Sequence, residues 1–185
     1  MKYVYVLLTR TGTMPARFIH IFTGGDFTHA SLTLHPVTND FYSYGRRKLH
    51  NPFYAGLIHE DIHSFVFAQY PDCNCAVYAI PVSEESYEKI GQAITYYMSH
   101  YDRCRYNFLG MLPAKIGIRI TRRYHFTCSQ FVAMLLHRAE EVQMPKDPYL
   151  MMPNDFQNIP GVQCIYRGKL KDCVIDPSLL ETATV

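Results

Sequence analysis

The sequence has no long apolar run. Its first residues, MKYVYVLLTRTG, are apolar only as far as Leu8, because Thr9 and Arg10 follow and no small-residue cleavage site comes after them. This is not the pattern of a secretory signal peptide. No apolar stretch approaches the roughly 20 residues that a membrane-spanning helix needs. We therefore expect a protein without a membrane span that resides in the cytoplasm.

The sequence also lacks an excess of charge of one sign. It has 18 Lys and Arg against 16 Asp and Glu, and its longest block of like charges is the triplet at residues 46–48. Nucleic-acid-binding domains are normally strongly basic, so we expect no nucleic-acid partner. Tryptophan is absent, and the 15 Tyr and 11 Phe alternate along strand-like segments. That alternation favours a core and a cleft wall over a surface that stacks on bases.

Internal repeats, low-complexity tracts and linkers are missing as well. The 185 residues, of which 48% are hydrophobic, can build one sizeable core, so residues 1–185 are expected to form a single domain. There are six cysteines, at positions 73, 75, 104, 128, 164 and 173. Without a secretory signal these should be free thiols, and the short CNC motif at 73–75 has no downstream pair to complete a metal site. We expect no cofactor.

The pattern of the chain predicts an α+β protein. Segments rich in β-forming residues precede most of the helical ones, and Ser83 is typical of a helix cap. A short helix is expected from Pro15 to the Gly24-Gly25 pair. Strands are expected at 3–8, 29–34, 41–45, 64–70, 75–82 and within 162–172, and longer helices at about 84–101 and 129–141.

Cys128 stands immediately before the apolar helix predicted at 129–141. A thiolate at a helix N-terminus is stabilised by the helix dipole and by free backbone N–H groups, which lower the pKa of the thiol. The backbone N–H of Cys128 could then face an oxyanion. The alternative interpretation is that Cys128 is simply a buried packing residue.

A cysteine nucleophile needs a base, and His29 is the strongest candidate among nine histidines. It begins a predicted strand, and the small residues Ala30 and Ser31 after it leave room around an imidazole. The alternative is an ordinary surface histidine at the start of a strand. Elsewhere HEDIH, His59 to His63, matches the H-E-x-x-H zinc motif, in which two histidines on a helix bind the metal. Because Gly56 and a strand-like segment flank the motif, we do not expect that helix.

Five segments occur together in a characteristic order: DFTHASLTL, FYSYGRR, NPFYAGLIHE, RYNFLGML and HFTCSQFVAMLL. They cover most of residues 26–136, and in them the chain resembles the circularly permuted papain-like hydrolases of the NlpC type. These include the YiiX-like amidases and, more distantly, the lecithin retinol acyltransferase-like enzymes. The resemblance implies a permuted papain-like fold with an antiparallel sheet or partial barrel packed on helices.

The resemblance also implies roles for individual residues. Cys128 would attack a carbonyl carbon, and His29 would hold or transfer the proton, giving a thioester intermediate. Either Ser43 or Glu60 would orient His29, and the residues do not decide between them. Tyr106 would place its hydroxyl at the oxyanion, unless it only packs beside Phe108.

These expectations describe a cysteine-dependent amidase, peptidase or acyl hydrolase. Its substrate would be a small molecule, a peptide or a lipid-like compound with an amide or ester bond, and Met144, Met151 and Met152 suit an apolar pocket. One alternative is a non-catalytic module that binds a ligand or lipid on the same fold. The second is a zinc hydrolase that uses His59, Glu60 and His63.

Overall fold

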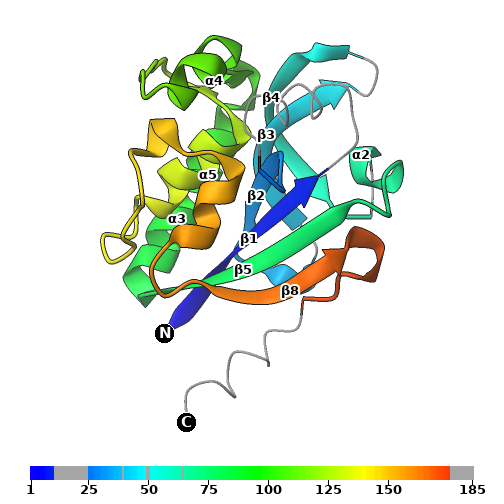
Figure 1. Cartoon of the computed structure of the whole chain (residues 1–185). Helices are drawn as coiled ribbons and strands as arrows, with labels where there is room; N and C mark the ends of the chain where they lie inside the picture. Colours follow the sequence, from blue (N-terminus) through cyan, green and yellow to red (C-terminus); the bar gives the residue numbers. More distant parts are fainter. Residues whose placement is uncertain (11–24, 39, 49–50, 64, 176–185) are drawn as a thin grey trace.

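The structure is a computed structural model that describes residues 1–10, 25–38, 40–48, 51–63 and 65–175. It is a mixed α+β arrangement in which the longer helices lie on one face of an antiparallel sheet (Figure 1). The order of strands in the sheet is β4-β3-β2-β1-β5-β8. These strands are β1 (Lys2–Arg10), β2 (His29–Thr33), β3 (Asp40–Lys48), β4 (Asn51–Asp61), β5 (Asn74–Val82) and β8 (Gln163–Lys169).

Four α-helices and a small second sheet complete the described elements. The second sheet is a parallel pair of short strands. None of the described helices is long and apolar enough to cross a membrane. The helices are α2 (Phe65–Ala68), α3 (Glu84–Ser99), α4 (Phe108–Lys115) and α5 (Cys128–Leu136), the paired strands are β6 (Arg105–Tyr106) and β7 (His125–Phe126), and 3-10 turns cover Pro36–Thr38, Tyr101–Arg103, Pro148–Leu150, Pro153–Asn158 and Leu170–Asp172.

The central strand β1 is buried on both faces. Val4, Val6 and Leu8 point into the core beneath the helices, while Tyr5 and Leu7 join a second cluster on the other face. Side chains alternate along a strand, so a strand covered on both faces reads as a continuous apolar run. This is why the segment YVYVLL is uninterrupted.

Helix α5 is fixed against the sheet by aromatic packing. Phe131 on α5 is fully buried, and its ring centroid lies 4.9 Å from that of Tyr44 on β3 and 5.4 Å from that of Tyr97 on α3. Aromatic pairs at this separation contribute beyond the area they bury. The first turn of α5 is therefore held in a defined position over β2 and β3.

The observed elements confirm most of the predicted strands, correct two other predictions and add one helix. The segment predicted as a strand at 64–70 contains helix α2 instead, although its Phe and Val residues favour strands. Helix α5 ends at Leu136, earlier than predicted, but Ala139 and Val142 are still buried. Helix α4 was not predicted, because Gly110 and Pro113 lie inside it. The helix expected from Pro15 falls almost wholly outside the described residues.

Candidate active site

Cys128 is the first residue of α5, and a capping box fixes the start of that helix. The Thr127 hydroxyl accepts a hydrogen bond from the backbone N–H of Gln130 at 3.2 Å, and the Gln130 side chain accepts one from the N–H of Thr127 at 3.0 Å. These reciprocal bonds satisfy two N–H groups that a helix leaves unpaired. The sulfur of Cys128 therefore lies at the positive end of the helix dipole.

The same helix turn is tied to neighbouring segments by buried side chains. The Ser129 hydroxyl donates to the carbonyl of Met151 at 2.6 Å, and the Gln130 amide donates to the carbonyl of Tyr149 at 2.8 Å. Asn107, which caps α4, donates to the Gln130 side-chain oxygen at 3.1 Å. Because α4 and the turns at Pro148–Leu150 and Pro153–Asn158 are connected to α5 in this way, they can form the walls around Cys128.

His29 begins β2 and is held by a carboxylate from another strand. Its Nε2 lies 2.8 Å from Oε1 of Glu60 on β4, and both side chains are mostly buried, with 18% and 10% of their surfaces exposed. The ring also interacts with the Cys128 thiol, since hydrogen bonding and charge between these two groups shift the pKa of both. Since Nε2 is occupied by Glu60, Nδ1 is the nitrogen left for the sulfur. The carboxylate, the imidazole and the thiol therefore lie in a row, with the imidazole in the middle.

The pKa values of His29 and Cys128 are shifted toward an ion pair. Burial alone would lower the pKa of His29, but the charge of Glu60 and the hydrogen bonds to Cys128 and Glu60 raise it to about 10. Burial alone would raise the pKa of Cys128, but the hydrogen bond and charge of His29 and the backbone N–H of Ala30 lower it. Both shifts favour the charged forms, a thiolate beside an imidazolium.

Tyr106 on β6 borders the sulfur. Its hydroxyl donates toward the sulfur of Cys128, with 4.0 Å between the oxygen and the sulfur. Burial, followed by the charge of Cys128, raises the pKa of Tyr106 well above its ordinary value, so the phenol keeps its proton at neutral pH. Its ring packs on Phe108 with centroids 4.8 Å apart. The position suits a hydrogen-bond donor to an oxyanion, and the packing fixes it.

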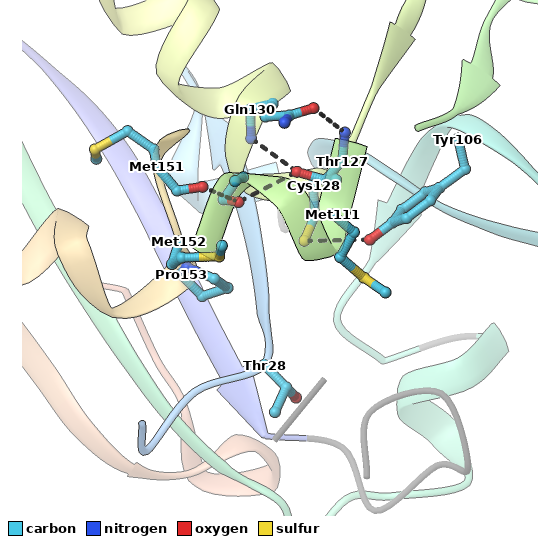
Figure 2. Close-up of a pocket in the computed structure, with 11 residues that line it drawn as sticks. Thr28, Tyr106, Met111, Thr127, Cys128, Gln130, Met151, Met152 and Pro153 are labelled. Carbon is cyan, nitrogen blue, oxygen red and sulfur yellow. Dashed lines mark hydrogen bonds between the residues drawn. The ribbon is translucent and has the colours of Figure 1, made fainter. Parts of the chain in front are cut away.

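A small pocket opens beside the sulfur (Figure 2). Its cavity volume is about 20 Å³, which is room for about one water molecule. Met144 does not line this pocket and packs instead against the core beneath the helices. The pocket is lined by Thr28, Tyr106, Met111, Ala114, Thr127, Cys128, Ser129, Gln130, Met151, Met152 and Pro153.

The structure separates the two candidates for orienting His29. The side chain of Ser43 is fully buried, and its hydroxyl donates to the carbonyl of Ala30 at 2.6 Å. This bond links strands β3 and β2 and does not involve the His29 ring. Glu60 is the candidate whose side chain reaches the His29 ring. Ser43 is therefore corrected from a candidate site residue to a structural one.

The HEDIH segment does not form the helix that the zinc motif requires. His59 and Glu60 are neighbours on strand β4, where successive side chains point to opposite faces. His59 stacks on Tyr42, with ring centroids 4.9 Å apart, and its Nε2 lies 3.1 Å from Oδ1 of Asp40. Among the residues the structure describes, no cluster of His, Cys, Asp or Glu could hold a metal ion. The zinc-binding arrangement of His59, Glu60 and His63 is thus contradicted by the strand geometry.

Asn154 and Gly25 also position the site, and neither was predicted from the sequence to do so. Asn154 accepts a hydrogen bond from the N–H of Phe27 at 3.1 Å and donates to its carbonyl at 2.9 Å, which fixes the chain just before His29. A Cβ on Gly25 would come within 2.1 Å of the Asn154 side chain, so the glycine leaves room for this contact. The two segments are far apart in sequence, which is why no local pattern predicted the pairing.

All six cysteines are free thiols, and their environments differ. Burial raises the pKa of Cys73 to about 11 and also raises that of Cys104. Cys75 and Cys173 hydrogen-bond each other in the second core cluster, which lowers the pKa of Cys173. Cys164 is exposed. Among these thiols, Cys128 combines a lowered pKa with contacts to a histidine and a tyrosine.

Comparisons of the chain with protein-family models, with curated proteins and with solved structures found no match. The interpretation of the site therefore depends on its own geometry and chemistry.

Proposed function

We propose that this protein is a cysteine-dependent hydrolase that cleaves an amide or ester bond through a thioester intermediate. The observation that carries the proposal is the buried row of Glu60, His29 and Cys128, in which Cys128 is the first residue of α5. A structural cysteine needs neither a paired histidine nor a carboxylate behind it. A nucleophilic cysteine of the triad type uses both, since the base must be oriented and its charged form stabilised.

The chemistry follows from these contacts. The Cys128 thiolate attacks the carbonyl carbon, and the carbonyl oxygen becomes an oxyanion that the backbone N–H of Cys128 and the hydroxyl of Tyr106 stabilise. The protonated His29 then donates its proton to the leaving amine or alcohol as the C–N or C–O bond breaks. Water attacks the resulting thioester, His29 accepts a proton from that water, and the acid is released with the thiolate restored.

Glu60 acts on this sequence through His29. Its carboxylate holds Nε2, which keeps Nδ1 directed at the sulfur and favours the imidazolium form. The fold we propose is the permuted papain-like arrangement, in which the histidine strand precedes the cysteine helix. The order of β2 and α5 supports this, as does the antiparallel sheet beneath α5.

The pocket lining favours an apolar acyl group lying beside the sulfur, with no more than a small end group entering, since the cavity has room for about one water molecule. Met111, Met151 and Met152 surround a narrow space with few charged groups, and methionine adapts to apolar ligands. A peptide, a lipid-like amide or ester, or a small molecule with such an acyl portion meets this requirement.

The test measures the reactivity of one thiol. In a Cys164→Ser background, which removes the exposed thiol, iodoacetamide at pH 6 should alkylate Cys128 at least about tenfold faster than the other cysteines. His29→Ala should abolish this advantage, whereas His35→Ala, at an exposed histidine beyond the other end of β2, should not. Peptide mass spectrometry gives the rate for each site.

A second measurement separates a hydrolase from a binding module. With p-nitrophenyl acetate, intact mass spectrometry should detect one acetyl group on Cys128 during turnover, and none on the Cys128→Ala variant. Uniformly slow alkylation of all cysteines, together with no acetylated intermediate, would show that the site binds ligand without catalysis.

A further inference from the structure

Helix α4 is apolar on every side although part of it faces solvent. In its sequence, FLGMLPAK, the final lysine is the one charged residue. Met111 and Ala114 face the pocket, but Leu109 and Leu112 are 66% and 48% exposed. A helix that is hydrophobic all round is normally covered on all sides. One side of α4 therefore lacks a cover within the described chain.

The exposed side of α4 belongs to a larger apolar surface. Phe53 on β4 is 82% exposed, and its ring centroid lies 6.2 Å from that of Phe108. Ile116, directly after α4, is 73% exposed. Among the residues that the structure describes, half of the twelve exposed large hydrophobic side chains gather here. We call the apolar patch the set Phe53, Phe108, Leu109, Leu112, Ile116 and Ile118.

The apolar patch borders the candidate active site. Phe108 in the patch packs on Tyr106, with centroids 4.8 Å apart, and Tyr106 lines the pocket beside Cys128. Met111, on the opposite side of α4 from the exposed leucines, lines the same pocket. In Figure 1, α4 and β4, the elements that carry most of the patch, lie at the same end of the molecule.

Lysine and arginine residues adjoin the patch along the chain. No Asp or Glu occurs between residues 103 and 139, a segment that contains seven Lys and Arg. Lys115 and Arg122 in this segment are exposed. On the other side of the patch, the Lys48 ammonium lies 5.2 Å from the centre of the Tyr54 ring. An apolar surface with a cationic rim is complementary to a negatively charged membrane, where acyl chains lie beneath anionic headgroups.

We propose that the apolar patch docks this protein onto anionic lipid surfaces, with Leu109, Leu112 and Ile116 entering the interface and Lys115 and Arg122 meeting the headgroups. An apolar surface bordered by Lys48, Lys115 and Arg122 matches the layering of an anionic bilayer, and this complementarity favours a lipid partner. Docking in this orientation brings the mouth of the pocket to the lipid surface. The binding itself requires no hydrolysis.

The test is flotation of the intact protein with lipid vesicles. Vesicles of phosphatidylcholine mixed with phosphatidylserine should bind the protein, and added salt or omission of phosphatidylserine should weaken the binding. Leu112→Glu/Ile116→Glu should reduce the partition coefficient at least about tenfold. Val37→Glu, at a site 74% exposed outside the patch, is the matched control and should leave it unchanged.

A second pair of variants tests the cationic rim. Lys115→Ala/Arg122→Ala should weaken binding to the anionic vesicles by roughly fivefold per residue, with little effect on phosphatidylcholine alone. Cys128→Ala should bind as the unaltered protein does, so a failure of the hydrolase proposal would not affect this result. Leu112, Ile116, Lys115 and Arg122 are exposed, so their substitution should leave the protein folded. Melting curves that match that of the unaltered protein will verify this.

Equal vesicle binding by the protein and by Leu112→Glu/Ile116→Glu would overturn the proposal. So would a complete lack of vesicle binding. If, in that case, the protein forms a dimer that the double glutamate variant separates, the apolar patch is a protein interface instead.

Discussion

At the residue scale, paired charges outweigh burial in the candidate site. Burial alone would keep both His29 and Cys128 neutral. Their mutual contact, with Glu60 behind the imidazole, favours the charged forms of both groups. Residues that support the ion pair therefore affect its pH range, and the residue that faces the oxyanion affects the rate.

Replacing Glu60 should narrow the pH range of the ion pair. Glu60→Gln keeps a hydrogen-bonding side chain but removes the charge that raises the His29 pKa to about 10. The alkaline limb of the activity profile reports loss of the imidazolium proton, so it should move to lower pH. Initial rates across the pH range, with Glu88→Gln on the exposed face of α3 as the control, measure the shift. An alkaline limb that stays in place would exclude Glu60 from this role.

Removing the Tyr106 hydroxyl should slow turnover but should leave the Cys128 thiol reactive toward alkylating agents. Tyr106→Phe retains the ring packing on Phe108 but deletes the donor near the sulfur. Loss of one oxyanion donor lowers kcat by roughly a hundredfold or more. Alkylation of Cys128 by iodoacetamide forms no oxyanion, so its rate should change far less. A kcat equal to that of the unaltered protein would mean that Tyr106 only packs.

At the scale of elements, helix ends and one strand register bring the site together. The capping box at Thr127 begins α5 at the residue that carries the thiol, and the β3–β4 pairing presents Glu60 to His29. Apolar periodicity and caps predicted α3 and the start of α5. They failed at α2, whose strand-forming residues adopt a helix, so tertiary packing overrides local preference there. They also failed at α4, whose glycine and proline obscure the helical pattern.

Deleting the cap of α5 should cost both stability and reactivity. Thr127→Ala leaves the N–H of Gln130 without its hydroxyl acceptor, which should lower the free energy of unfolding by about 1 kcal/mol. Because Cys128 follows directly, its alkylation at pH 6 should slow as well. Urea unfolding and alkylation rates are the measurements.

The matched control for this change lies on a different helix. Ser83 caps α3 by accepting a hydrogen bond from the N–H of Ser86 at 3.1 Å. Ser83→Ala should reduce stability by a similar amount yet leave the reactivity of Cys128 unchanged. A parallel loss of reactivity in both variants would mean that general destabilisation, and not the position of the cap, is responsible.

At the scale of the whole molecule, the ion pair should give stability a defined pH dependence. The pKa of His29 is raised on folding, so its contribution is complete below about 6.5 and is lost as pH rises through about 10. The pKa of Cys128 is lowered, so its contribution is complete above the ordinary thiol value and is lost as pH falls through the lowered one. The two slopes oppose each other up to the ordinary thiol value, roughly pH 8.5.

The pair should therefore stabilise the fold across a plateau and less on either side. The measurable quantity is the difference in free energy of unfolding between the protein and His29→Ala/Cys128→Ala at each pH, from urea unfolding. This difference should rise with pH on the acidic side, stay level near neutrality and fall toward pH 10. A difference that does not vary with pH would show that the two groups are neutral in the folded protein.

The sequence by itself determined which segments alternate as strands, where a helix begins, and that a cysteine stands at that beginning, because these depend on neighbours along the chain. It named His29 and Tyr106 but left Ser43 and Glu60 undecided. Tertiary structure decided that choice, since residues from β2, β4 and α5 meet only once the sheet has formed and α5 has packed on it. It also decided which side of α4 remained exposed. A side chain's partners across strands are set by register and packing, which no local sequence pattern contains.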